Sequence, residues 1–484
     1  MRRMGLLAIP LLVLAGCFGG SRPDYEGIQG DAVEAALPLL AQDHGSDDGH
    51  LEAALHNGSF NLEEVGYHNG VDESGDPDAI PPAGYYTELV VKGDYAYLAR
   101  MSADGSYGGF VILDVRDVAH PIKIGEYRGQ GLNDIEVNDD QTLAFLATQR
   151  GTIEQIAGGL AATQDPTSVL SRGIVVVDIS DKTNPTLAGF LPMPYNGPHT
   201  LTYVNHPDGN QYLVACTYDL TRNTIPSSTA PSPIADYTVV PLTQRLFVYQ
   251  IAANPVPGAP GAGLVLVNSF AIIEPAPAGR LFLPHDAAVE VRGNETLLHV
   301  AYFDKGVHIL DFSTPAQPPL MELGTGYTEF APSKLNAIHQ VRPFAAPIDG
   351  HHVLAAEPEV ISATDETGYI TFLDTADPAH ITKLGHWTLP GDLGVQGLEF
   401  SPHNLDTFDG KVALAHNHAG LWIIDVSDGR NLAEPKTVGW FMATPERESP
   451  VKMQPYFWGV FEENGYLFAS DEATGLHILR YTGP

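Results

Sequence analysis

Short apolar runs recur along the chain, and each is followed by a polar turn that contains Asp, Ser or Pro. A run, a turn and a second short apolar segment predict a strand–turn–strand unit rather than a helix. Before each unit lies another apolar segment that is typical of the second strand of a hairpin. The clearest copies are residues 108–127, 172–191, 305–324, 367–387 and 419–441, and shorter copies lie at 244–251 and 474–481.

Seven such copies, each with about four short strands at a period of roughly 40–60 residues, predict an all-β fold, a seven-bladed β-propeller. The strands are nearly continuous apolar runs instead of strictly alternating ones, as expected when neighbouring blades cover both faces of each sheet. The last copy lacks a fourth strand, but residues 60–69, "FNLEEVGYHN", are similar to outer-strand segments such as "PTLAGFL". We therefore expect this N-terminal strand to complete the last blade and close the ring, which places the propeller at residues 59–484.

The copies "VVVDIS", "WIIDVSD" and "HILDFS" resemble the LVIVD repeat of bacterial and archaeal extracytoplasmic propellers. The resemblance implies a propeller that works outside the cytoplasm. It implies little about chemistry, because propellers carry unrelated functions.

The first residues have the pattern of an export signal. Two arginines precede a short apolar run that ends in "LAGC", residues 14–17. This ending resembles a bacterial lipobox, which implies cleavage before Cys17 and lipidation of its thiol. The alternative is ordinary signal cleavage with loss of Cys17. We accordingly expect a signal peptide at 1–17, an acidic flexible spacer at 18–58, and a membrane-anchored protein in the periplasm or at the cell surface.

The net charge and the number of cysteines exclude some classes of function and of structure. The net charge of -34 repels phosphate backbones, so nucleic-acid binding is not expected. Apart from Cys17 the chain contains only Cys216, so the mature chain has no partner for an internal disulfide. We expect a monomer that meets the membrane through its lipid anchor and binds a small molecule or a peptide.

A histidine opens the innermost strand in four consecutive blades. The innermost strands of a propeller line its central channel, so their first residues lie together at one mouth. Counting outward from the short hairpin turns predicts which residues face each other across the first hairpin of a blade. The predicted pairs are His199 with Tyr218, His285 with Tyr302, His403 with His416, and Trp458 with Asp471; a longer loop allows His339 to be placed only near Ala356 and Glu357.

Neutral imidazoles on rigid strands can converge on a transition metal such as Fe, Cu or Zn. The candidate ligands are His199, His285, His339, His403 and His416. The alternative is that duplicated blades keep a histidine that only hydrogen-bonds a neighbouring loop. By contrast, an aspartate that recurs at the end of the third strand is predicted to accept amide hydrogens of the turn. These aspartates are Asp114, Asp178, Asp311, Asp374 and Asp425.

The sequence thus favours a metal-binding pocket at one mouth of the channel. If the protein is an enzyme, it would be a metal-dependent oxidoreductase or hydrolase that acts on a small molecule. Tyr218, Tyr302 or Glu357 would then serve as proton donor or base. The competing interpretation is a non-enzymatic surface module that recognises a protein, a peptide or a glycan with the same face.

Overall fold

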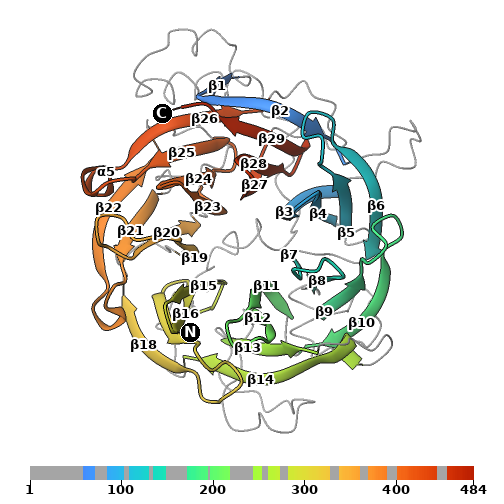
Figure 1. The fold of residues 1–484 in the computed structure, drawn as a ribbon, viewed down its shortest axis with the longest axis horizontal. Helices are drawn as coiled ribbons and strands as arrows, with labels where there is room; N and C mark the ends of the chain where they lie inside the picture. Colours follow the sequence, from blue (N-terminus) through green and yellow to red (C-terminus); the bar gives the residue numbers. More distant parts are fainter. Residues whose placement is uncertain are drawn as a thin grey trace, which may run out of the picture.

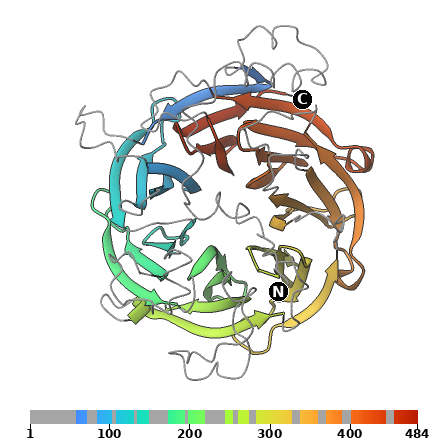
Figure 2. The same ribbon diagram turned by 180° about the vertical axis from the view of Figure 1, so that it is seen from behind.

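In the computed structural model, seven antiparallel sheets stand in a ring around a central channel (Figures 1 and 2). The described residues are 58–70, 84–102, 108–129, 134–148, 172–193, 197–218, 244–252, 260–272, 282–326, 337–359, 369–389, 401–443 and 455–483. The seven-bladed propeller predicted from the repeats is confirmed, and each repeat supplies the third and fourth strands of one blade. No helix in these segments has the length and apolar character needed to cross a membrane.

Each blade has four strands in chain order from the channel outward, and we number the blades 1 to 7 along the chain. The innermost strands are β3 (Gly84–Lys92), β7 (Asp134–Val137), β11 (Pro198–Asn205), β15 (Asp286–Arg292), β19 (Ala337–Pro343), β23 (Leu405–Phe408) and β27 (Phe457–Glu463). The second strands are β4 (Tyr95–Ser102), β8 (Leu143–Thr148), β12 (Gln211–Tyr218), β16 (Glu295–Tyr302), β20 (Val353–Glu359), β24 (Lys411–Ala415) and β28 (Tyr466–Asp471).

The outer half of each blade is formed by the repeated segment. The third strands are β5 (Gly108–Asp114), β9 (Gly173–Asp178), β13 (Gln244–Ile251), β17 (Gly306–Asp311), β21 (Tyr369–Asp374), β25 (Leu421–Asp425) and β29 (Gly475–Tyr481). The outer strands are β6 (Ile122–Gly129), β10 (Thr186–Pro192), β14 (Leu264–Ala271), β18 (Met321–Gly326), β22 (Thr382–Thr388), β26 (Lys436–Met442) and β2 (Leu62–His68). Short helical turns are η4 (Pro260–Gly263), η5 (Pro378–His380) and α5 (Gly429–Ala433).

The N-terminal segment closes the ring, as predicted. Strand β2 pairs with β29 and is the fourth strand of blade 7. The preceding β1 (Gly58–Phe60) pairs with β26 and adds a fifth strand to blade 6, which the sequence did not indicate. A partly buried hydrogen bond of 2.8 Å joins Glu64 Oε1 of β2 to His477 Nδ1 of β29. The first and last described strands are therefore held in the adjacent blades 6 and 7.

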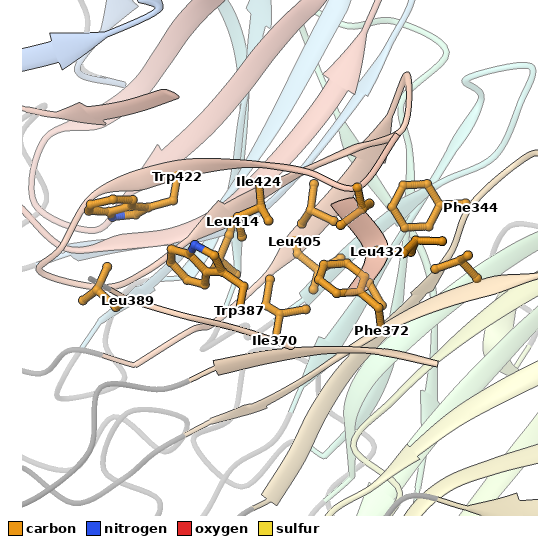
Figure 3. Close-up of a cluster of buried hydrophobic side chains, with 14 of the residues drawn as sticks. Phe344, Ile370, Phe372, Trp387, Leu389, Leu405, Leu414, Trp422, Ile424 and Leu432 are labelled. Atoms are coloured by element: carbon orange, nitrogen blue, oxygen red, sulfur yellow. The ribbon is translucent and has the colours of Figure 1, made fainter. Parts of the chain in front are cut away.

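Apolar side chains fill the space between neighbouring blades. Figure 3 shows the cluster between blades 5 and 6, in which Trp387 of one blade packs against Trp422 of the next at a ring-centroid distance of 5.8 Å. The third strands are buried along their length and end at the recurring aspartate, which is only partly buried.

The recurring aspartates are structural, as predicted. In each case Oδ1 accepts the backbone amide two residues later, at 2.9–3.1 Å, and this bond shapes the turn to the outer strand. The residues are Asp114, Asp178, Asp311, Asp374 and Asp425.

In four blades a glycine in the outer strand lets the blade approach the next one closely. A Cβ atom on Gly125 would lie 1.9 Å from the carbonyl oxygen of Lys182, in the turn of the following blade. The corresponding distances are 1.7 Å at Gly66, 1.9 Å at Gly324 and 2.0 Å at Gly385. Backbone meets backbone at this point, so only glycine fits without a shift of the blades.

We expect Gly125→Ala to lower the free energy of unfolding by about 1–3 kcal/mol, because the added methyl forces blades 1 and 2 apart. The matched control is Gly439→Ala in the outer strand of blade 6, where the nearest neighbour of a Cβ is 3.1 Å away. Denaturant titration of both variants measures the difference. Equal losses at the two positions would contradict the close-approach explanation.

Candidate metal centre

The histidines at the channel mouth occupy β-bulges. In blade 5, Ile338 pairs with Pro358 and Gln340 pairs with Glu357, which leaves His339 as the extra residue. In blade 6, the His403 amide donates to the Ala415 carbonyl while the Ala415 amide donates to the Asn404 carbonyl, so two residues oppose one. A bulge bends the strand and redirects the extra side chain. The residues at this position in blades 3 to 7 are His199, His285, His339, His403 and Trp458.

These bulges overturn the predicted cross-strand pairs. His199 lies between the pairs Pro198–Thr217 and Thr200–Cys216, so it does not face Tyr218. His285 and Asp286 both oppose Ala301, and in blade 7 it is Phe457, not Trp458, that pairs with Asp471. For the same reason His403 does not face His416, and His285 does not face Tyr302. The predicted pairs follow from counting residues outward from the hairpin turn, which assumes a regular ladder of paired residues. One inserted residue shifts every pair that lies farther from the turn than the bulge.

The bulged side chains form one continuous row around the channel mouth, which we call the histidine row: His199, His285, His339 and His403. Their ring centroids are separated by 4.4, 3.9 and 4.5 Å in this order. The row ends at Trp458 of blade 7, whose ring lies 4.1 Å from that of His403. Side chains from four blades, distant in the sequence, are thus brought together as the sequence suggested.

Hydrogen bonds set the tautomers in this row. His285 Nδ1 is 2.9 Å from the carbonyl oxygen of His339, and His403 Nδ1 is 2.9 Å from that of Trp458. A carbonyl oxygen only accepts, so both Nδ1 atoms carry the proton and the Nε2 atoms carry the lone pair. His339 Nδ1 is instead 2.8 Å from Oε1 of Glu357. In His285 and His403 the unprotonated Nε2 is therefore the atom suited to ligate a metal, and in His339 the engagement of Nδ1 with Glu357 leaves Nε2 as the nitrogen available for a ligand.

His339 and His403 of the histidine row, together with Glu359, meet the geometric requirement for a metal site. One ring nitrogen each of His339 and His403 and one carboxylate oxygen of Glu359 lie within 4.8 Å of one another, and all three residues are buried. His339 Nε2 lies 3.9 Å from Glu359 Oε2 and has no hydrogen-bond partner in the described part of the chain. Ligands at about 2.0–2.1 Å from a tetrahedral ion are about 3.4 Å apart, so a contraction of at most about 1.4 Å between any two of these atoms would complete the site. We call these residues the metal triad.

Glu359 was missed by the sequence analysis. It ends β20, two residues after Glu357, and side chains two apart on a strand point to the same face. The segment "AAEPEV" therefore offered a signal, but the long loop before β20 prevented the register from being counted. Glu357 itself is placed as predicted, beside His339.

The remaining candidates occupy other surroundings. The ring of His416 lies 6.3 Å from that of Trp387, in the apolar layer between blades 5 and 6. Tyr302 packs against Phe270 and His308 in the core between blades 3 and 4, and burial raises its pKa. Tyr218 ends β12, and its side chain lies outside the described residues.

Burial favours neutral groups throughout the row. It lowers the pKa of His199 and of His285 well below the usual range, and neighbouring histidines lower both further. Burial also lowers the pKa of His339, against the opposing effect of Glu359. Burial and the charge of Asp286 raise the pKa of Glu357 well above its ordinary value. Neutral imidazoles are the form that binds metals, so these rings need no deprotonation at neutral pH.

Several carboxyl groups of the inner strands are buried with raised pKa values. Burial, together with Asp286 and Glu136, raises the pKa of Glu88 to about 8 against the Leu89 amide and Arg342. Burial likewise raises the pKa of Glu136 to about 7. Arg342 stands among these groups, its Nη1 3.8 Å from Asp286 Oδ2. Burial thus favours the neutral forms of these acids, as it does for the histidines.

Comparisons with known proteins support the repeat. Residues 83–128, 169–191 and 288–323 match the LVIVD repeat and fall in blades 1, 2 and 4. No curated protein matches the chain. The crystal structure of Saccharomyces cerevisiae Sqt1 is similar over 86% of this chain and 83% of that one, with 10% identity and a TM-score of 0.47. The fold assignment rests on the sheet topology itself.

The buried His416 makes stability depend on pH. Burial lowers its pKa to about 3, whereas an unfolded histidine titrates near about 6.5. Below about pH 6.5 the unfolded chain binds a proton that the folded chain does not, so stability falls by up to about 1.4 kcal/mol per pH unit towards pH 3. Denaturant titration between pH 7.5 and 5, with a chelator present, should show a shallower pH dependence for His416→Leu than for wild type. Identical slopes would sink this expectation.

Proposed function

We propose that this protein is an exported, lipid-anchored propeller that holds a divalent transition metal at the metal triad. We further propose that the site performs hydrolytic or oxidative chemistry on a small molecule that enters at the histidine mouth. The convergence of His339, His403 and Glu359 from blades 5 and 6 carries the proposal.

The donor set suits this role. Two imidazoles and one carboxylate are typical of catalytic zinc sites and of non-haem iron sites, and both leave coordination positions open for water or substrate. When bound, such an ion supplies a Lewis acid or activates oxygen. The residues of the chain bind the ion through Nε2 of His339, Nε2 of His403 and a Glu359 oxygen, and the buried surroundings exclude bulk water.

The tautomers support ligation over a purely structural role. A histidine that served only to tie loops together would need hydrogen bonds at its ring nitrogens. His339 uses Nδ1 towards Glu357, while its buried Nε2 faces the Glu359 carboxylate at a distance too long for a hydrogen bond. An ion between these two atoms would give His339 Nε2 a partner.

We expect protein purified without a histidine tag to contain about one equivalent of a transition metal, because three ligands meet at one point. The His339→Ala/His403→Ala variant should lose it, and Glu359→Gln should weaken it. Elemental analysis and zinc titration after chelator treatment measure this. The control is His380→Ala, an exposed side chain of the outer turn in blade 5.

A further variant, His199→Ala, tests the extent of the site. It should retain the metal if the triad is the site, and should lose it if all four rings of the row bind one ion. Metal-free wild-type protein that binds neither zinc, iron nor copper would refute the proposal and favour a surface recognition module instead.

The anchor is tested separately. Cys17 follows "LAG" after a short apolar run, which supports lipidation of its thiol. We expect Cys17→Ser to move the protein from the membrane fraction to the soluble fraction and to abolish the lipid mass of the mature N-terminal peptide. Unchanged membrane association with an unmodified N-terminal peptide in wild type would contradict the proposed anchor.

A further inference from the structure

His339 differs from its neighbours in the partner of its Nδ1 atom. His285 and His403 each donate to a backbone carbonyl of the next blade, a bond that any residue in that place could accept. The His339 ring likewise has a backbone hydrogen bond with His403 of the next blade, but its Nδ1 in addition lies 2.8 Å from Oε1 of Glu357, from the second strand of its own blade. His339 therefore lies between the carboxyl groups of Glu357 and Glu359. The group that holds its Nδ1, Glu357, is a side chain, which depends on the residue at that position of the sequence.

Glu357 is built into the bulge that carries His339. Its backbone pairs with Gln340, the residue that follows the bulged histidine, and the Gln340 amide also hydrogen-bonds the carboxylate. The side chain is fully buried and its Oε1 lies 2.8 Å from His339 Nδ1. One carboxylate thus fixes both the bulged backbone and the ring that projects from it.

We propose that Glu357 is a positioning residue that holds His339 in the one tautomer and ring orientation that directs Nε2 at Glu359 and His403. This inference rests on the proposed metal function. It replaces the role of acid or base that the sequence suggested for Glu357, because a fully buried group that is bonded to the back of a ligand does not touch a substrate.

The physical reason lies in the symmetry of imidazole. Rotation of the ring by 180° about χ2 exchanges the nitrogen and carbon positions at little steric cost. A fixed acceptor behind Nδ1 makes one orientation favourable and increases the basicity of the ligating nitrogen. Loss of such partners typically weakens metal binding by about 10–100-fold.

Two conservative variants separate the position of the oxygen from the ability of the group to ionise. Glu357→Gln keeps the length of the side chain and an oxygen at that position, but it cannot ionise. Glu357→Asp keeps an ionisable carboxyl group and withdraws its oxygens by one methylene. The proposal expects zinc affinity, measured by competition with a chromophoric chelator, to fall about 10–100-fold in the Asp variant and much less in the Gln variant.

The Co²⁺ absorption spectrum gives a readout that simple packing damage does not move. It should match wild type in Glu357→Gln and change in Glu357→Asp. The matched control is Glu322→Asp, because Glu322 Oε1 makes the same bond to Nδ1 of His308, at 2.6 Å, in blade 4. This variant should bind zinc as wild type does.

Wild-type affinity in both Glu357 variants, or a greater loss in Gln than in Asp, would overturn the positioning role. Both results presuppose wild-type protein that binds zinc and Co²⁺. Failure of wild type to bind either ion would instead refute the proposed function, so the two failures are distinguishable.

Discussion

The candidate site depends on one backbone irregularity, the β-bulge at the start of the innermost strands. In a regular ladder these side chains would simply follow the alternation of their strands between the two faces of the sheet. The extra residue turns them towards the neighbouring blade, where His285 Nδ1 meets the His339 carbonyl and His403 Nδ1 meets the Trp458 carbonyl. The rings of His285 and His403 are thus positioned by the blade that follows each of them.

The site consequently depends on the closed ring of blades, because neighbouring blades position its side chains. A single blade offers no acceptor for its own bulged histidine in blades 4 and 6, and neighbours stay in register through polar links between inner strands. Gln340 Oε1 accepts the Leu405 amide at 2.6 Å, and the Thr202 hydroxyl donates to the Ala287 carbonyl at 2.8 Å. The outer-strand glycines allow the close approach that these links require.

The hydrogen bonds of His285 and His403 fit two hypotheses equally well. Duplicated blades could retain structural histidines, or the histidines could be held in place to bind a metal. The Nδ1–carbonyl bonds of His285 and His403 repeat from blade to blade, as duplication would leave them. His339 departs from this pattern because Glu357 adds a side-chain partner at its Nδ1 and Glu359 stands on the other side of the ring. Duplication of the blades accounts for the row of histidines. Glu357 and Glu359 of β20 distinguish His339 from the other histidines of the row.

The sequence by itself determined the seven blades, their strands, the aspartate turns, the N-terminal closing strand and the gathering of histidines at one mouth. These features follow from local signals: apolar runs, turn residues and repeat spacing. Only the tertiary structure decided which side chains converge. Because of the bulge in blade 6, His403 does not pair with His416. The register of β20 places Glu359 close to His339 and His403. A bulge is stabilised by contacts between blades, so no pattern within one strand reveals where it will form.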